Sequence, residues 1–220
     1  MYPHFEKLPE EKKAAIIQAC LEEFAAHGYK QASTNRMTAR AGIAKGLLFH
    51  YFGNKKNLYL YLLQHAITVL AERLAERMKE MTSEDFFQRA KELTIIKIRL
   101  ALEYPHETLL LMKAVTDLPP AVKPEADRLI ARITEEMAGV NHQYLFSYLE
   151  TAPLRPHLSR EQALAVIMAL FEQLGQKYLR LYQGREQELL QHPEVMLQEL
   201  DLYCDILKYG IYERPSANDL

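Results

Sequence analysis

The stretch Thr34–Leu58, TNRMTARAGIAKGLLFHYFGNKKNL, decides the fold. Its apolar spacing predicts two short helices separated by a turn at Gly42, and a longer helix that opens after residues 53–54. Lys45 stands at the start of the second helix, and Lys55 and Lys56 at the start of the third, where cations oppose the positive end of a helix dipole. Residues that are unfavourable for local structure, such as these lysines, occur most often at functional sites. A helix N-terminus with an added lysine is suited to bind a phosphate. The stretch therefore indicates a helix-turn-helix that binds a nucleic-acid backbone.

The distribution of charge agrees with a DNA-binding segment near the N-terminus. The whole chain has 27 Lys and Arg against 29 Asp and Glu, but residues 1–60 hold nine Lys or Arg against five Glu. Because residues 1–60 are basic and the rest of the chain is acidic, a nucleic-acid partner is expected to bind the first quarter of the chain. From charge alone, a chance fluctuation on a solvated surface remains the alternative.

The chain as a whole is predicted to be all-α, because nearly every segment has a period near 3.6 residues and none alternates as a strand would. About nine helices are expected, over approximately residues 9–28, 34–41, 44–52, 54–81, 82–104, 106–117, 125–149, 159–184 and 193–211. Ser159 and Gln162 form a capping box at the start of one of them. We expect a small N-terminal domain, residues 8–70, joined by a shared fourth helix to a larger helical domain, residues 71–214.

Several classes of protein are not expected. Cys20 and Cys204 lie in separate apolar contexts, and no C-x-x-C or paired His spacing predicts a metal site. The charged N-terminus lacks a signal-peptide core, and the longest apolar run, Ala163–Phe171, is far too short to span a membrane. We therefore expect a cytoplasmic protein that does not contact a membrane. No phosphate loop, nucleophile motif or carboxylate dyad indicates an enzyme, so no catalytic residue, metal or cofactor is predicted.

The helix-turn-helix hypothesis makes three physical demands. Its turn needs a residue that tolerates a positive φ, which Gly42 supplies. Its inner face must pack, and the residues with suitable helical spacing are Met37, Ala41, Ile43, Leu48 and Phe52. Its outer face must offer donors and flat contacts to DNA, and the residues there are Lys45, Gly46, Phe49, His50 and Tyr51. A solvated helix is the alternative, although such a helix seldom carries Phe, His and Tyr in succession.

Residues 10–70 resemble the DNA-binding domain of the TetR family of bacterial transcription regulators. Residues 41–58, AGIAKGLLFHYFGNKKNL, follow that family's pattern A-G-[VI]-[ST]-K-G-x-[LI]-[YF]-x-[YH]-F-x-x-K-x-x-L almost position by position. The run F-A-x-x-G-Y at residues 24–29 also fits. Ala44 departs from the pattern, since the family usually has Ser or Thr there, and it loses a helix cap. Leu47 is a second departure, an apolar residue that could meet a thymine methyl group.

The resemblance implies a transcriptional regulator that binds a palindromic operator as a homodimer and is released by a small molecule. Repression is the family's usual mode. Thr34, Tyr51 and Lys55 would hold phosphates of double-stranded DNA, and Lys45 would lie near the backbone or a base. The candidates to face base edges are Asn35, Arg36, Gly46, Leu47, Phe49 and His50. Of these, Arg36 could pair with a guanine and Asn35 with an adenine. Arg40 is either a phosphate contact or solvated.

In the TetR family the remaining helices bind a ligand and form the dimer. Two apolar faces on residues 159–184 and 193–212 independently predict a homodimer, with one thick monomeric core as the alternative. The expected interface residues are Val166, Leu170, Leu174, Leu200, Tyr203, Leu207 and Ile211. The effector, expected to be hydrophobic or amphipathic, would contact Phe87, Tyr104, Met112, Met137, Tyr144, Phe171 and Tyr178. Met and aromatic residues at helical spacing are more often ordinary core.

Charged residues of the body at otherwise apolar positions, Lys97, Arg99 and Glu172, are candidates to neutralise a charged effector, although solvated helix faces suit them as well. A structural or chromosome-associated DNA-binding protein that needs no effector is the alternative function. The sequence identifies neither the effector nor the operator.

Overall fold

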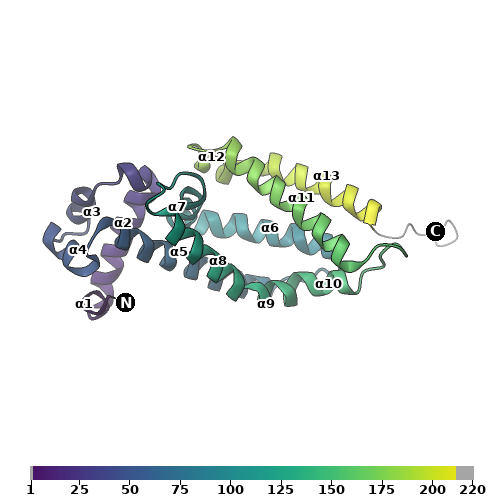
Figure 1. Cartoon of the computed structure of the whole chain (residues 1–220), viewed down its shortest axis with the longest axis horizontal. Coiled ribbons are helices and arrows are strands. Elements are labelled where there is room, and N and C mark those ends of the chain that lie inside the picture. Colours follow the sequence, from purple (N-terminus) through teal and green to yellow (C-terminus); the bar gives the residue numbers. More distant parts are fainter. Residues whose placement is uncertain (1, 212–220) are drawn as a thin grey trace. The chain divides into compact units, whose positions relative to one another are not determined.

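The computed structural model describes residues 2–211, apart from the side chain of Ile211, and these residues form helices and no strands. The all-α prediction is confirmed. The elements in chain order (Figure 1) are α1 (Pro3–Glu6), α2 (Glu10–Gln31), α3 (Thr34–Arg40), α4 (Lys45–Phe52), α5 (Lys55–Met78), α6 (Phe86–Glu103), α7 (Pro105–Thr116), α8 (Lys123–Glu136), α9 (Ala138–Asn141), the π-helix η1 (His142–Phe146), α10 (Ser147–Glu150), α11 (Arg160–Leu181), α12 (Glu186–Gln191) and α13 (Glu194–Ile211). None of these helices is long and apolar enough to cross a membrane.

The helices are more numerous and shorter than the nine expected, because α1 and α12 were not predicted and the helix expected over residues 125–149 is divided. The division includes η1, where the carbonyl oxygen of Tyr144 accepts a hydrogen bond of 2.6 Å from Nε of the buried Arg89. A side chain that bonds to a helical carbonyl is a recognised cause of such an irregular turn. The periodic sequence pattern does not contain this tertiary contact.

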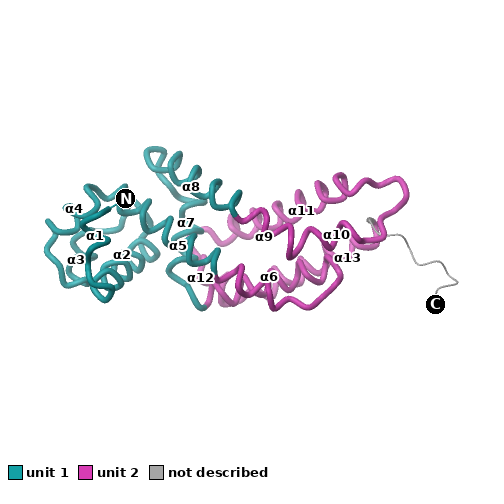
Figure 2. Tube along the Cα trace, turned by 90° about the horizontal axis from the view of Figure 1, so that it is seen from below, with its two compact units in different colours: residues 1–72, 103–136 teal, residues 73–102, 137–220 magenta. Residues whose placement is uncertain are grey.

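The chain divides into two compact units (Figure 2). Unit 1 comprises residues 1–72 and 103–136, and unit 2 comprises residues 73–102 and 137–220. Unit 1 therefore contains the predicted helix-turn-helix together with α7 and α8. The division of α5 between the units falls after residue 72. The domain boundaries expected from sequence, at residues 8–70 and 71–214, stay a prediction.

The core of unit 1 is built around α2, which packs against α3 and α7. Phe24 and Leu62 are completely buried in it. The sequence predicted that this helix ends at Gly28. Gly28, with a φ of 65°, instead kinks α2 near its C-terminal end, and the helix continues to Gln31. In unit 2, α11 packs against α13, and the predicted capping box of Ser159 and Gln162 is present at the start of α11.

Candidate nucleic-acid interface

The position of α4 is set by its buried face and by the turn that precedes it. Leu48 and Phe52, one turn apart, are buried, as is Met37 of α3. Gly42 has a φ of 64°, which confirms the prediction that the turn needs a residue tolerant of positive φ. Together these features fix the opposite face of α4 towards solvent.

The solvent face of α4 contains most of the residues that were predicted to contact DNA. Lys45, Gly46, Leu47 and His50 are exposed, whereas Phe49 and Tyr51 are half-buried. The N-cap residue Ala44 makes no side-chain hydrogen bond, as its lack of a hydroxyl predicts. The first N–H groups of α4 therefore remain able to bind an anion.

Arg36 of α3 is held by α2. Its Nε donates to both carboxylate oxygens of Glu23, at 2.9 and 3.0 Å, and its Nη2 donates to Glu23 and to the carbonyl of Gln31. The Nε–Nη2 edge of the guanidinium, one of the edges that could bind a guanine in a bidentate manner, is thus occupied. The neighbouring Asn35 is exposed and Thr34 is half-buried, and Ser33 is the residue that caps α3.

Glu23 is a buried carboxylate, with 1% of its surface accessible. Burial alone would raise the pKa of Glu23. The hydrogen bonds from Arg36 and from the N–H of Ser33, with the charges of His27 and Arg36, outweigh this effect and hold that pKa below its usual range. The ionised carboxylate therefore ties the start of α3 to α2, because the Ser33 N–H donates to it at 2.8 Å.

The second arginine of α3 is paired as well. Arg40 Nη1 lies 3.0 Å from Glu22 Oε2. By contrast, Lys45 forms no ion pair or side-chain hydrogen bond with any residue in the part of the chain that the structure describes. Of the three Lys and Arg residues on α3 and α4, two are neutralised by α2 and one is free to meet a phosphate.

Lys55, predicted to hold a phosphate, lies at the start of α5 and is half-buried. Its Nζ donates to the carbonyl of Ala32 at 2.7 Å and lies 5.1 Å from the centre of the Tyr29 ring. Burial lowers the pKa of Lys55. In this structure the ammonium binds the chain between α2 and α3. Asn54 caps α5, as predicted, by accepting the N–H of Asn57 at 2.8 Å.

The N-terminal segment packs against α4, a contact that the sequence did not predict. Phe5 is completely buried and its ring centre lies 4.8 Å from that of Phe52. Tyr2 contacts the same ring at 5.1 Å. The His4 ring centre is 5.0 Å from that of the exposed His50. Aromatic residues at positions 2 and 5, with a proline between them, were the available signal of a short helix.

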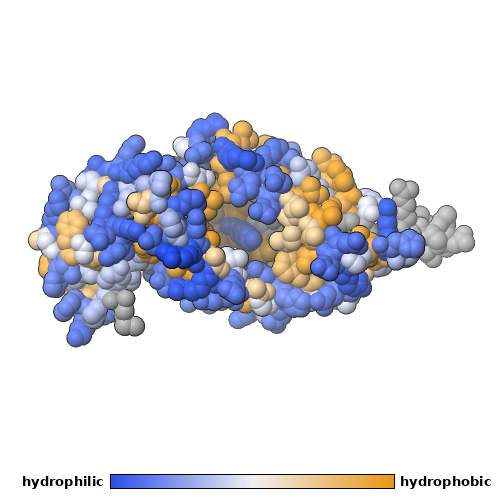
Figure 3. Space-filling model, in the orientation of Figure 1, coloured by the Kyte–Doolittle hydropathy of each residue, from blue (hydrophilic) through white to orange (hydrophobic). Residues whose placement is uncertain are grey.

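Unit 2 contains a cavity of about 570 Å³ between α6, η1, α11 and α13. On the face seen in Figure 3 the surface is hollowed over α6, and apolar side chains border the hollow. The residues that line the cavity are mostly apolar and include Leu93, Ile98, Phe146, Met168 and Phe171, with Lys97 and Glu172 as its charged members. Its size and composition suit a small organic molecule.

Of the residues predicted to form a ligand pocket, Phe171 lines this cavity. Phe87 and Tyr178 are buried in unit 2, where Tyr178 donates a hydrogen bond to Glu199 at 2.9 Å. Met137 and Tyr144 are half-buried elsewhere in unit 2, and Tyr104 and Met112 belong to unit 1. Sequence spacing did not distinguish cavity residues from core residues.

The residues predicted to form a dimer interface also divide between two faces. Leu174, Leu200 and Leu207 are buried within unit 2, Leu170 and Tyr203 are half-buried, and Val166 is exposed. The side chain of Ile211 lies outside the described residues. A different set of apolar residues on α13 is exposed instead, and it consists of Val195, Leu202, Ile206 and Tyr209.

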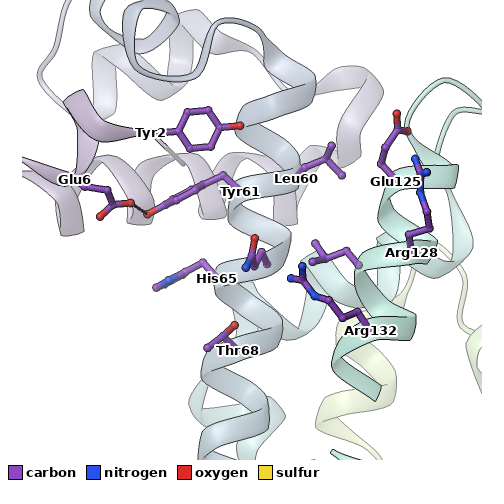
Figure 4. Close-up of a pocket in the computed structure, with 11 residues that line it drawn as sticks. Tyr2, Glu6, Leu60, Tyr61, His65, Thr68, Glu125, Arg128 and Arg132 are labelled. Atoms are coloured by element: carbon purple, nitrogen blue, oxygen red, sulfur yellow. Dashed lines mark hydrogen bonds between the residues drawn. The ribbon is translucent and has the colours of Figure 1, made fainter. Parts of the chain in front are cut away.

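A second hollow, of about 840 Å³, lies within unit 1 between α5 and α8. Figure 4 shows Arg132 extending from α8 towards α5, while Tyr61 and His65 lie on the side of α5 that faces Glu6. Tyr61 donates a hydrogen bond of 3.3 Å to Glu6, and burial lowers the pKa of His65. The charges around this hollow do not converge on one point, so it lacks the organisation of a chemical site. Among residues 2–211, no three His, Cys, Asp or Glu side chains are close enough to hold a metal ion.

Comparison with known proteins matches both parts of the chain. The model of the family "Bacterial regulatory proteins, tetR family" matches residues 16–62, and that of "Tetracyclin repressor-like, C-terminal domain" matches residues 82–212, more than half of the chain. The transcriptional repressor AcnR of Corynebacterium glutamicum is 35% identical over 77 residues, which cover 35% of this chain and 37% of that repressor. AcnR of Corynebacterium efficiens is 26% identical over 147 residues, 65% of this chain and 78% of that protein. The match to the first of these repressors thus spans little more than a third of its length.

A solved structure extends the similarity to almost the whole chain. The crystal structure of a TetR family transcriptional regulator from Chloroflexus aurantiacus superposes with a TM-score of 0.57 and 26% identity, over 96% of this chain and 98% of that one. The family matches cover both the helix-turn-helix and the helices that follow it. The chain belongs to the tetR family of bacterial regulatory proteins.

Proposed function

We propose that this protein is a transcriptional repressor that binds a palindromic operator as a homodimer and is released by a small molecule bound in unit 2. The observation that carries the proposal is the solvent face of α4. It presents Lys45, Gly46, Leu47 and His50 at an uncapped helix N-terminus, within a segment that matches the family model. A bacterial protein with this role acts on DNA in the cytoplasm.

The DNA contacts are assigned from exposure and from hydrogen-bond partners. Lys45 and the N–H groups at the start of α4 bind the phosphate backbone, and Asn35, Leu47 and His50 face base edges. Arg36 positions α3 against α2 through Glu23 and presents only the Nη1 side of its guanidinium to DNA. Base edges in the major groove specify sequence, whereas phosphate contacts fix orientation.

The exposed stripe of α13 supports a homodimer. Ile206 and Val195 each expose 59% of their surface, and Leu202 exposes 57%. Val166 of α11 is also exposed. Contiguous apolar surface of this kind is characteristic of an interface, so we place the two-fold contact on α11 and on this face of α13. A two-fold dimer presents two α4 helices to successive major grooves, about 34–36 Å apart.

The ligand acts by binding one conformation of the dimer more tightly than the other. The shift in the DNA-binding equilibrium can be no larger than the ratio of the ligand's affinities for the two conformations. By linkage, DNA must weaken ligand binding by the same factor as the ligand weakens DNA binding. Equal ligand affinity with and without operator would contradict this part of the proposal.

Selection of bound duplexes from a random DNA pool, followed by affinity measurements against salt concentration, tests the proposal. A dimeric repressor enriches a palindrome with half-sites about one helical turn apart. Steep salt dependence without an enriched sequence would instead identify a structural DNA-binding protein. Absence of binding would refute both functions.

A further inference from the structure

The cavity in unit 2 has a cation at a position where helix periodicity calls for an apolar residue. Lys97 lies one turn after Leu93 and one turn before Ala101 on α6, and all three line the cavity. Leu93 and Ala101 are buried, whereas Lys97 remains accessible because it faces the hollow. Lys97 thus places a cation among the residues that line the cavity.

The charge of Lys97 is not balanced by the protein. Lys91, on the same helix, lies 2.7 Å from Asp201, and Lys177 of α11 lies 2.6 Å from Glu199. Lys97 makes no such contact with any residue among 2–211, and Glu172, the other charged residue of the cavity wall, is not within ion-pair distance of it. The helices around Lys97 exclude enough water to lower the pKa of its ammonium. A bound anion would pair with this cation and offset its partial loss of hydration.

The charge and number of the polar groups narrow the class of anion. A phosphate with two negative charges is usually held by several donors or by an arginine fork, and here one lysine is opposed by Glu172 on α11. A group with a single negative charge fits this arrangement better. The remaining wall, which includes Ile98, Phe146 and Phe171, provides apolar contact for the rest of the molecule.

We propose that the effector is an amphipathic monocarboxylate whose carboxylate binds Lys97 and whose apolar part lies between α6, η1 and α11. The inference rests on the proposed function, because it names the chemical class of the molecule bound in the same cavity. It excludes neutral and cationic amphipaths as the preferred ligands. A neutral molecule would leave the Lys97 charge unpaired, and a cation would be repelled by it.

Calorimetric titration of the full-length protein without DNA tests the proposal, with decanoate, decan-1-ol and decylammonium as probes below their micelle-forming concentrations. Decanoate is expected to bind at least about tenfold more tightly than the alcohol, as a charge-assisted hydrogen bond in a shielded site allows. Lys97→Met should abolish that preference and leave the affinity for the alcohol unchanged. Lys97→Arg, which keeps the charge, should preserve the preference.

Lys91→Met is the matched control, since it removes a lysine of α6 that is already paired with Asp201. It should bind decanoate as the unmodified protein does. Equal binding of acid and alcohol, no binding of any probe, or an acid preference that survives Lys97→Met would overturn the proposal. Since no DNA is present, these results bear on the ligand class alone, whereas failure to enrich an operator would overturn the repressor function.

Discussion

Glu23→Ala should lower the stability of unit 1 by far more than the removal of a surface carboxylate would. The buried carboxylate accepts the N–H of Ser33 at 2.8 Å, and a hydrogen bond to a charged group contributes about 1.5–3 kcal/mol. The substitution also removes a buried methylene, worth about 0.8 kcal/mol. We therefore expect a loss of about 2–4 kcal/mol in the free energy of unfolding, or about 5–15 °C in Tm for a chain of this size.

Glu22→Ala is the matched control for this prediction. Glu22 is the adjacent residue and pairs with Arg40 at 3.0 Å, but both partners of that pair are accessible to solvent. Exposed ion pairs contribute about 0–1 kcal/mol, so the control should lose little stability. Urea and thermal unfolding followed by circular dichroism, at one fixed protein concentration, measure both variants. Equal losses for the two substitutions would refute the role assigned to the buried carboxylate.

The ion pair between Glu23 and Arg36 bears on the role of Arg36 in DNA binding. If Arg36 acts by holding α3 against α2, Arg36→Met should lower affinity by a similar factor for every base-substituted operator. A residue that reads a guanine would instead lose discrimination at one base pair, by about 1–3 kcal/mol. Fluorescence anisotropy with a panel of operators distinguishes the two results, and a loss confined to one G·C pair would contradict the positioning role.

Four further predictions concern the same unit. Phe5→Ala should cost about 3 kcal/mol, the lower end of the range for buried Phe because a terminal segment can detach locally, with exposed His4→Ala as the control in thermal unfolding. Lys45→Ala should reduce the slope of log affinity against log salt by about one unit, and an unchanged slope would argue against a phosphate contact. His50→Ala should change relative affinities at one base position, and a uniform loss would assign it to the backbone. The stability difference between the unmodified protein and Glu23→Gln should be complete above pH 4.5 and shrink as the pH falls through the lowered pKa of Glu23, which pH-dependent urea denaturation can follow.

The sequence predicted the features that depend on local chemistry. The turn glycine Gly42, the Asn54 cap and the Ser159–Gln162 capping box all lie within a few residues of the groups that they serve, so spacing alone was sufficient. The helix-turn-helix followed from the same local rules and from the family pattern.

The sequence could not supply contacts between distant segments. Arg36 and Glu23 are 13 residues apart, and Arg89 and Tyr144 are 55 apart, so the partner of each arginine depends on how helices pack. The same limit explains the cavity, where Phe171 and the buried Tyr178 have similar sequence contexts but different surroundings. Periodicity identifies a buried face and does not say whether a core or a hollow lies behind it.

The neutralisation of Arg36 and Arg40 by α2 has a consequence for the search along the chromosome. A repressor competes with an enormous excess of unrelated DNA, to which it adheres mainly through cations that contact phosphates. Pairing Arg36 and Arg40 with carboxylates of α2 weakens that general adhesion and leaves recognition to base contacts and few phosphates. For the repressor function proposed above, a cell would need fewer copies of the protein to keep an operator occupied, because fewer copies would be sequestered elsewhere on the genome.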